Sequence, residues 1–141
     1  MIGEVLNPEQ VKEQWWQIAP LLALAVSKND GELLLEDIPK LVVDRQMFIG
    51  VVREAPGEEI QLVLAGDVVI YPRKKVLNVA FVGGKPLVQS RAKHLYPVLE
   101  DIARKLGCTT IQGQCGPGAT RFYTRLMGMT PTYTILRKEV T

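Results

Sequence analysis

Three consecutive β-type segments in the middle of the chain constrain the fold more than any other part of the sequence. Segments 47–54, 60–72 and 76–84 are rich in β-branched residues, and the turn-type stretches APGEE and RKK separate them. Strands joined by such short turns pair as antiparallel hairpins. The sequence therefore predicts an antiparallel meander, with an irregularity at Gly66 and Asp67 in its second strand. The third segment is apolar on both faces, which places it inside the sheet.

Amphipathic helices are expected on either side of this meander. The clearest covers residues 90–107, where Ser90 is a candidate N-cap and apolar residues recur at helical spacing. Two helices are expected before the meander, over 7–26 and 35–46. Pro20 should kink or divide the first of them.

The remaining C-terminal part alternates again between strand and helix. A short strand is expected at 108–114, a short helix at 118–128 and a closing strand at 130–140. No repeat or linker interrupts this order, so the chain is interpreted as one domain, residues 1–141. The expected class is α/β (α+β), with a central, mostly antiparallel twisted sheet and helices on both faces.

Composition and charge exclude several classes of function. With 17 basic and 15 acidic side chains, the net charge of +2 is too balanced to indicate nucleic-acid binding. Two cysteines give no disulfide framework, and a single histidine leaves a Cys/His zinc site short of ligands. The longest apolar stretch, IAPLLALAV, is far shorter than the roughly 20 residues that span a membrane. The N-terminus lacks a signal-peptide pattern, so a reduced, cytoplasmic protein without a metal site is expected.

The order of these elements resembles the fold of the GNAT family of N-acetyltransferases over about the whole chain. The most specific likeness lies in the C-terminal third, where KLGCTTIQ and GATRFYTRLMGM resemble the segments before the last strand of these enzymes. GEVL at 3–6 is similar to a short first strand. The ending TYTILRKEV also resembles small GNAT-like proteins encoded by bacteriophages, including internal virion proteins.

The resemblance implies acetyl-CoA as the acyl donor, bound where the third strand of the meander leads into the long helix. In the family, a loop of the form Q/R-x-x-G-x-G/A presents backbone N–H groups to the pyrophosphate at the helix N-terminus. The stretch VGGKPLVQSRA departs from that form, because its glycines come early and Pro86 has no N–H. The residues implied for the phosphates are Val82, Gly83, Gly84, Lys85, Ser90 and Arg91. The alternative stays open that the two glycines only make a turn and that Ser90 only caps the helix.

Acetyl transfer to an amine also needs a base and an acid. Tyr123 resembles the tyrosine that protonates the leaving thiolate in the family, but it precedes Gly128 by five residues rather than four, so a packing role is the alternative. The third strand of the meander carries no carboxylate. Asn78 and Gln112 can orient a water molecule but take its proton poorly. Asp67 is the only acidic residue in the strand region after the first hairpin turn.

Two functions therefore remain open. One is an acyltransferase that uses acetyl-CoA and an unknown small-molecule or protein amine. The other is a non-catalytic GNAT-fold phage protein that contacts virion or host proteins, in the host cytoplasm or the virion. The missing loop motif favours the second function. So do Trp15 and Trp16, which are adjacent and cannot both face one core.

Overall fold

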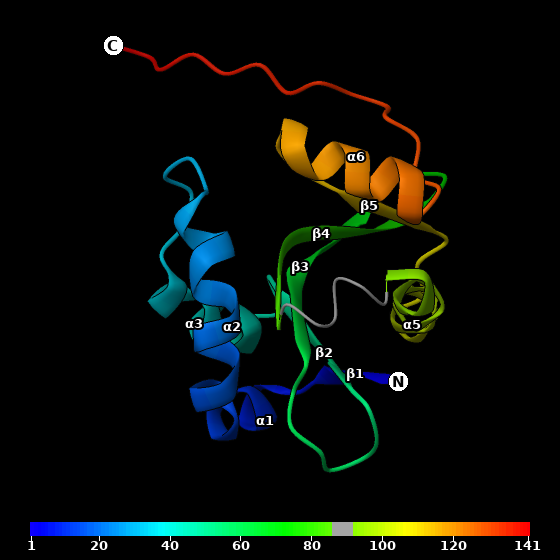
Figure 1. The fold of residues 1–141 in the computed structure, drawn as a ribbon. Coiled ribbons are helices and arrows are strands. Elements are labelled where there is room, and N and C mark those ends of the chain that lie inside the picture. Colours follow the sequence, from blue (N-terminus) through cyan, green and yellow to red (C-terminus); the bar gives the residue numbers. More distant parts are fainter. Residues whose placement is uncertain (86–91) are drawn as a thin grey trace.

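A five-stranded sheet is the centre of the computed structural model, which describes residues 1–85 and 92–141 (Figure 1). The strands are arranged in chain order, β1-β2-β3-β4-β5. The first four pair antiparallel, and β5 pairs parallel to β4. In chain order the elements are β1 (Ile2–Leu6), α1 (Pro8–Glu13), α2 (Trp15–Ser27), the 3-10 turn η1 (Leu35–Asp37), α3 (Ile38–Val43), β2 (Phe48–Arg53), β3 (Leu62–Ile70), β4 (Lys75–Gly84), α5 (Ala92–Lys105), β5 (Thr110–Gly113) and α6 (Pro117–Leu126).

The predicted antiparallel meander is confirmed as β2, β3 and β4. The predicted irregularity is present at Gly66, but the extra residue lies in the third strand of the meander, β4, and not in the second. Ala65 pairs with Phe81 but Gly66 pairs with Val79, so β4 carries one extra residue at this point. Glycine is required here, because a Cβ at Gly66 would lie 1.9 Å from the backbone oxygen of Asn78.

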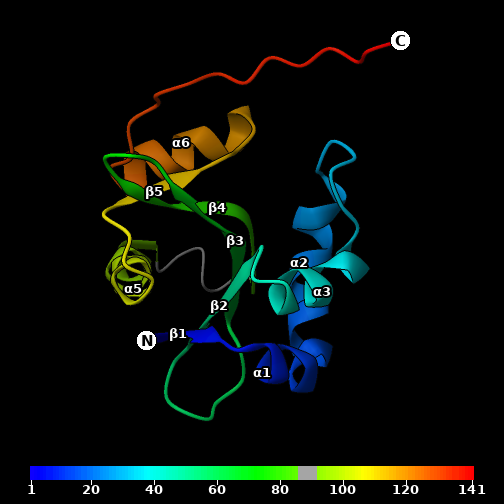
Figure 2. The same cartoon turned by 180° about the vertical axis from the view of Figure 1, so that it is seen from behind.

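Helices cover both faces of the sheet, and each face has its own apolar core (Figures 1 and 2). On one face, α1, α2 and α3 pack on β2 and β3 through a cluster that includes Ile18, Leu22 and Ile49, each 0% exposed. On the other face, the apolar stripe of α5 packs on the sheet around Ile102, which is also 0% exposed. The predicted α/β class with helices on both faces is therefore confirmed. Among the described helices, none combines the length and apolarity needed to cross a membrane.

The N-terminal helical region divides at a different residue from the one expected. Asn7 caps α1 as predicted, and its side chain accepts a hydrogen bond of 2.9 Å from the Gln10 N–H. The break comes at Gln14, while α2 continues through Pro20. The missing N–H of Pro20 would have bonded the carbonyl of Trp16, which lies in the first turn of α2, so little of the helix loses a hydrogen bond.

The expected closing strand over 130–140 is wrong, because the structure has no strand after β5. Gly128, at φ 64°, and a hydrogen bond of 3.1 Å from the Met129 N–H to the Tyr123 carbonyl end the region around α6. From Thr130 onward the chain runs away from β5 toward the end of α2 (Figure 1). The alternating pattern supplies a suitable strand face, but a strand also needs a neighbouring edge, and the path of this segment takes it away from its own sheet.

Candidate active site at the fork between β4 and β5

The candidate site lies where β4 and β5 separate. The two strands pair only from Val76 opposite Thr110 to Val79 opposite Gly113. Beyond Val79, β4 continues to Gly84, and among the described residues β3 is its only neighbouring strand. Within residues 1–85 and 92–141, the edge of β4 beyond the last pair thus has no strand paired to it on the β5 side.

The backbone of β4 offers hydrogen-bonding groups to this gap. The Lys85 N–H donates to the Gln61 carbonyl at 3.1 Å, on the β3 side. Backbone groups along an antiparallel strand alternate between its two sides. Val82 and Gly84 therefore direct their N–H and C=O groups toward the fork, where they are available to an extended ligand.

A cavity of about 310 Å³ occupies the fork between the sheet, α5 and the end of α6. Its wall is mainly apolar. The fourteen lining residues come from β2 to β5, both helices and the segment after α6: Val52, Leu62, Leu64, Val79, Val82, Gly84, Leu95, Leu99, Ile111, Gln112, Gly113, Tyr123, Met127 and Met129. A narrow apolar space beside a strand edge suits a thin chain that carries a few amide groups.

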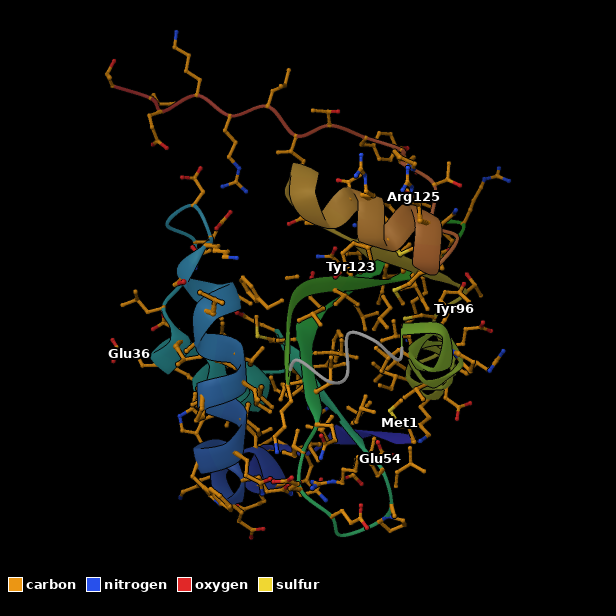
Figure 3. All side chains as sticks on the ribbon, viewed as in Figure 1. Met1, Glu36, Glu54, Tyr96, Tyr123 and Arg125 are labelled. Atoms are coloured by element: carbon orange, nitrogen blue, oxygen red, sulfur yellow. The ribbon has the colours of Figure 1, made fainter. Side chains whose placement is uncertain are left out.

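Tyr123 brings a hydroxyl group to this apolar wall. The residue is half-buried and packs against the α5-side core, and Figure 3 shows it between α6 and β4. Burial raises the pKa of the Tyr123 hydroxyl, and the neighbouring Cys115 raises it further when its thiol is ionised. The hydroxyl therefore stays protonated at neutral pH and can donate a proton.

The structure brings together three of the seven site residues named from the sequence, namely Tyr123, Val82 and Gly84. It places Gly83 elsewhere, because a Cβ on Gly83 would lie 1.8 Å from the carbonyl oxygen of Leu21 in α2. Gly83 thus allows α2 to approach the sheet closely.

The idea that Gly83 and Gly84 only make a turn is wrong, because both are paired residues of β4, opposite Val63 and Leu62. Neither glycine adopts a positive φ. Lys85 forms an ion pair of 2.8 Å with Glu59, and this ion pair lowers the pKa of the Glu59 carboxyl. The predicted phosphate contacts of Ser90 and Arg91, and the capping role of Ser90, lie outside the described residues.

A row of three polar side chains crosses the sheet next to the fork. Asn78 donates from Nδ2 to Asp67 Oδ1 at 2.8 Å, and Gln112 donates from Nε2 to Asn78 Oδ1 at 3.1 Å. Asn78 is only 9% exposed, while Asp67 and Gln112 are half-buried. Because a carboxylate only accepts, Asp67 sets the orientation of both amides, so that the Gln112 carbonyl oxygen is left as an acceptor. Gln112 also lines the cavity, so the row and the cavity share a residue.

Sequence reasoning named these three residues separately and missed that they form one row. The position of the β3–β4 turn could have revealed the row. A hydrogen bond of 2.8 Å from the Tyr71 N–H to the Lys74 carbonyl closes this turn. Counting back from that turn along both strands brings Asp67 opposite Asn78, as the register shows.

A second, more open hollow of about 700 Å³ lies on the α2 side of the sheet, beside the α1–α2 junction and the β2–β3 loop. At its base is Arg53, 7% exposed, which donates to Glu4 at 3.3 Å, to the Glu58 carbonyl at 2.6 Å and to Gln14 Oε1. Trp16 lines its wall and is 74% exposed, whereas Trp15 packs against the core. The expectation that only one tryptophan faces the core is confirmed. Within the described ranges, no three His, Cys, Asp or Glu side chains gather as metal ligands would.

Comparisons with known proteins agree on the fold. No protein-family model matches the sequence, and no curated protein does either. Among solved structures, a ribosomal-protein-alanine N-acetyltransferase from Brucella melitensis is similar over 99% of this chain and 100% of its own, with a TM-score of 0.71 and 14% identity. An aminoglycoside acetyltransferase from an uncultured soil metagenomic sample has a TM-score of 0.68 and 16% identity over 99% of this chain and 94% of its own. A GNAT family acetyltransferase from Staphylococcus aureus has a TM-score of 0.65 and 14% identity over 99% and 98% of the two chains.

The fold is GNAT-like. At these identities, the similarity establishes the architecture and leaves the chemistry to the residues of this chain.

Proposed function

We propose that this chain is a GNAT-type acyltransferase that moves an acetyl group from acetyl-CoA to an amine. The carrying observation is the fork, where an unpaired edge of β4, an apolar cavity and the Tyr123 hydroxyl meet. The domain of residues 1–141 and a cytoplasmic location belong to the same proposal.

The residues of the fork fit the acyl donor in part. Val82 and Gly84 offer backbone groups to the amides of its pantetheine arm, and the apolar wall suits the methylene groups between those amides. The phosphates are assigned to the start of α5 with Lys85, Ser90 and Arg91. To contact the phosphates, Lys85 must break its ion pair with the exposed Glu59. This requires little free energy, because exposed ion pairs are weak. When bound, the donor supplies a thioester carbonyl that an amine can attack.

Two groups of this chain are assigned to the proton transfers. Tyr123 donates its proton to the departing thiolate, and its raised pKa keeps that proton in place until it is needed. Asp67 takes the proton of the amine through an ordered water molecule, while Asn78 and Gln112 hold the orientation of the polar row. The third strand of the meander, β4, carries no carboxylate. In this proposal the carboxylate comes from Asp67 on the neighbouring strand, β3.

Calorimetry and a thiol-release assay test the proposal. Acetyl-CoA should bind the full chain, and free CoA should appear when amines such as an aminoglycoside or an alanine-ended peptide are added. Tyr123→Phe should lower turnover by about 10²- to 10⁴-fold and leave acetyl-CoA affinity nearly unchanged. A folded protein that gives no heat with acetyl-CoA at millimolar concentration would contradict the proposal.

A second candidate function, a non-catalytic contact protein of the phage or virion type, rests on a different observation. Trp16 is 74% exposed beside an open hollow, and exposed tryptophan is enriched at interface hot spots. The similar structures described above, which are acetyltransferases by name, add no support for it. Capture of a virion or host protein by the wild type and not by Trp16→Ala, together with absent acetyl-CoA binding, would favour this function.

A further inference from the structure

The turn between β3 and β4 lies beyond the neighbouring strands of the sheet. The β2–β3 pairing stops at Gly66 and the β4–β5 pairing at Val76, whereas the β3–β4 pairing continues to Ile70 opposite Lys75. Within the described residues, no further strand pairs with the hairpin at this point. Residues 70–75, the hairpin end, therefore project from the sheet.

A short, closed turn holds the hairpin end in one shape. The Tyr71 N–H donates to the Lys74 carbonyl at 2.8 Å, and the Thr109 N–H donates to the Lys75 carbonyl at 3.0 Å. Pro72 lies inside the turn and restricts its backbone. The side chains of the hairpin end are thus carried on a preformed support, so binding a partner costs little backbone entropy.

The hairpin end combines exposed apolar side chains with basic ones. Ile70 is 76% exposed and Tyr71 is 49% exposed. Arg73 and Lys74 are also exposed, and Lys75 is half-buried. Because Ile70 and Lys75 are paired residues, their side chains leave the same face of the hairpin. Apolar and basic groups therefore share one small surface.

No acidic side chain offsets the charge of this surface. The sequence has no Asp or Glu between residues 68 and 85. In the part of the chain that the structure describes, the ion pairs of basic residues involve Arg53, Lys85, Arg104 and Arg137, and none involves the hairpin end. The surface therefore complements an anionic partner. It does not suit the same surface of a second copy, because like charges repel.

We propose that the hairpin end docks on an anionic lipid surface. Its three basic side chains lie against the headgroups, and Ile70 and Tyr71 enter the interface between headgroups and acyl chains. Each basic side chain near anionic lipids strengthens binding by about fivefold. Aliphatic and aromatic side chains beside basic ones are typical of interfacial anchors.

The apolar side chains favour a lipid surface over a nucleic acid. A nucleic acid would match the charges, and its bases could stack on Tyr71, but it offers no apolar partner to Ile70. The chain lies on the membrane in this proposal, because none of the described helices is long and apolar enough to cross it. The docking does not depend on the proposed acyl transfer.

Flotation of the full chain with lipid vesicles tests the proposal. The wild type should bind vesicles of phosphatidylcholine and phosphatidylserine in about a 7:3 ratio, and it should not bind vesicles of phosphatidylcholine alone. Raising the salt concentration from about 0.1 M to about 1 M should release most of the bound protein, because the Debye length falls from about 10 Å to about 3 Å.

Variants locate the contact. Arg73→Gln with Lys74→Gln should weaken binding about 25-fold, which is about fivefold for each lost charge. The matched control, Lys12→Gln with Lys28→Gln, removes two exposed charges from α1 and the end of α2 and should bind like the wild type. Ile70→Ser keeps every charge and should weaken binding about tenfold, the lower end for burying one aliphatic side chain. All three variants should melt near the wild type, because the replaced side chains are exposed.

Weaker vesicle binding by the hairpin double variant and by Ile70→Ser, with the control unchanged, supports the docking. A wild type that does not bind the anionic vesicles overturns it, including one that binds single-stranded RNA instead. Equal losses in the double variant and its control overturn it as well, because net charge and not the hairpin end would then cause the binding. Full binding by Ile70→Ser also overturns it, because the apolar side chain would then play no part.

Discussion

Gly83 and Gly84 are adjacent in β4, but replacing each by alanine should have a different effect. Gly83→Ala should lower stability, and Gly84→Ala should lower the affinity for acetyl-CoA. At Gly83 a methyl group would lie 1.8 Å from the Leu21 carbonyl oxygen and 2.6 Å from its carbon, both backbone atoms of α2. The helix must move away from the sheet, which loosens the packing of Ile18 and Leu22. Overpacking commonly costs about 1–3 kcal/mol, and an unyielding backbone obstacle places Gly83→Ala at the upper end, about 3 kcal/mol.

At Gly84 the obstacle is softer. The methyl group would lie 2.8 Å from the terminal Cδ1 of Leu62, which can rotate, and 3.0 Å from the Gln61 carbonyl oxygen. Replacing glycine in a strand also gains about 0.5–1 kcal/mol from chain entropy. Gly84→Ala should therefore change stability little. It should weaken acetyl-CoA binding by about tenfold, or about 1.4 kcal/mol, because the methyl group narrows the cavity. Gly84→Val should weaken it more.

Thermal unfolding and calorimetry on the two variants separate these effects. For a chain of this size, about 3 kcal/mol lowers Tm by about 10 °C, so Gly83→Ala should melt near that much below the wild type. Gly84→Ala should melt close to the wild type and bind acetyl-CoA more weakly. The reasoning is refuted if Gly83→Ala keeps the wild-type Tm, or if Gly84→Ala binds with unchanged affinity.

Three further predictions concern the α5-side core, Tyr123 and the cysteines. Ile102→Ala should lower the free energy of unfolding by about 2–5 kcal/mol, measured by urea titration, because Ile102 is 0% exposed at the centre of that core; a loss under 1 kcal/mol would contradict the packing. The raised pKa of Tyr123 means that the unfolded chain loses this proton first, so stability should fall as pH rises above about 10, and Tyr123→Phe should lessen that fall; melting curves at several pH values decide it. Burial raises the pKa of the Cys108 thiol, so a thiol reagent should modify exposed Cys115 in the native protein and reach Cys108 only on unfolding; equal rates would argue against it.

Local patterns were enough to predict the meander, its irregularity and the long helix. Residues 47–84 hold three segments rich in β-branched residues between clear turn signals. The apolar stripe of α5 recurs with period 3.6. Each of these features is encoded within one element or one hairpin. Gly66 could also be identified, because a glycine inside a strand suggests a bulge or a close backbone approach.

Features that depend on distant parts of the chain could not be predicted in the same way. Gly83 is needed because the backbone of α2 lies close to it. The sequence around Gly83 does not indicate the position of α2. Residues 130–140 alternate as a strand does, but pairing depends on an edge being within reach. The three polar residues of the Asp67 row needed the hairpin register to be assembled. Tyr123 was found through resemblance, and its place on the cavity wall comes from the packing of α6.

The most direct test of the account is where acetyl-CoA binds on the full chain. In ¹⁵N–¹H correlation spectra of the assigned protein, titration with acetyl-CoA should shift the amide signals of Val82 and Gly84, whose N–H groups face the fork. The Gln14 amide, which bonds the Gln10 carbonyl at 2.9 Å at the α1–α2 junction beside the other hollow, should not move. Shifts confined to Gln14 and its neighbours, or no shift at saturating acetyl-CoA, would contradict the assignment of the fork as the acyl-donor site.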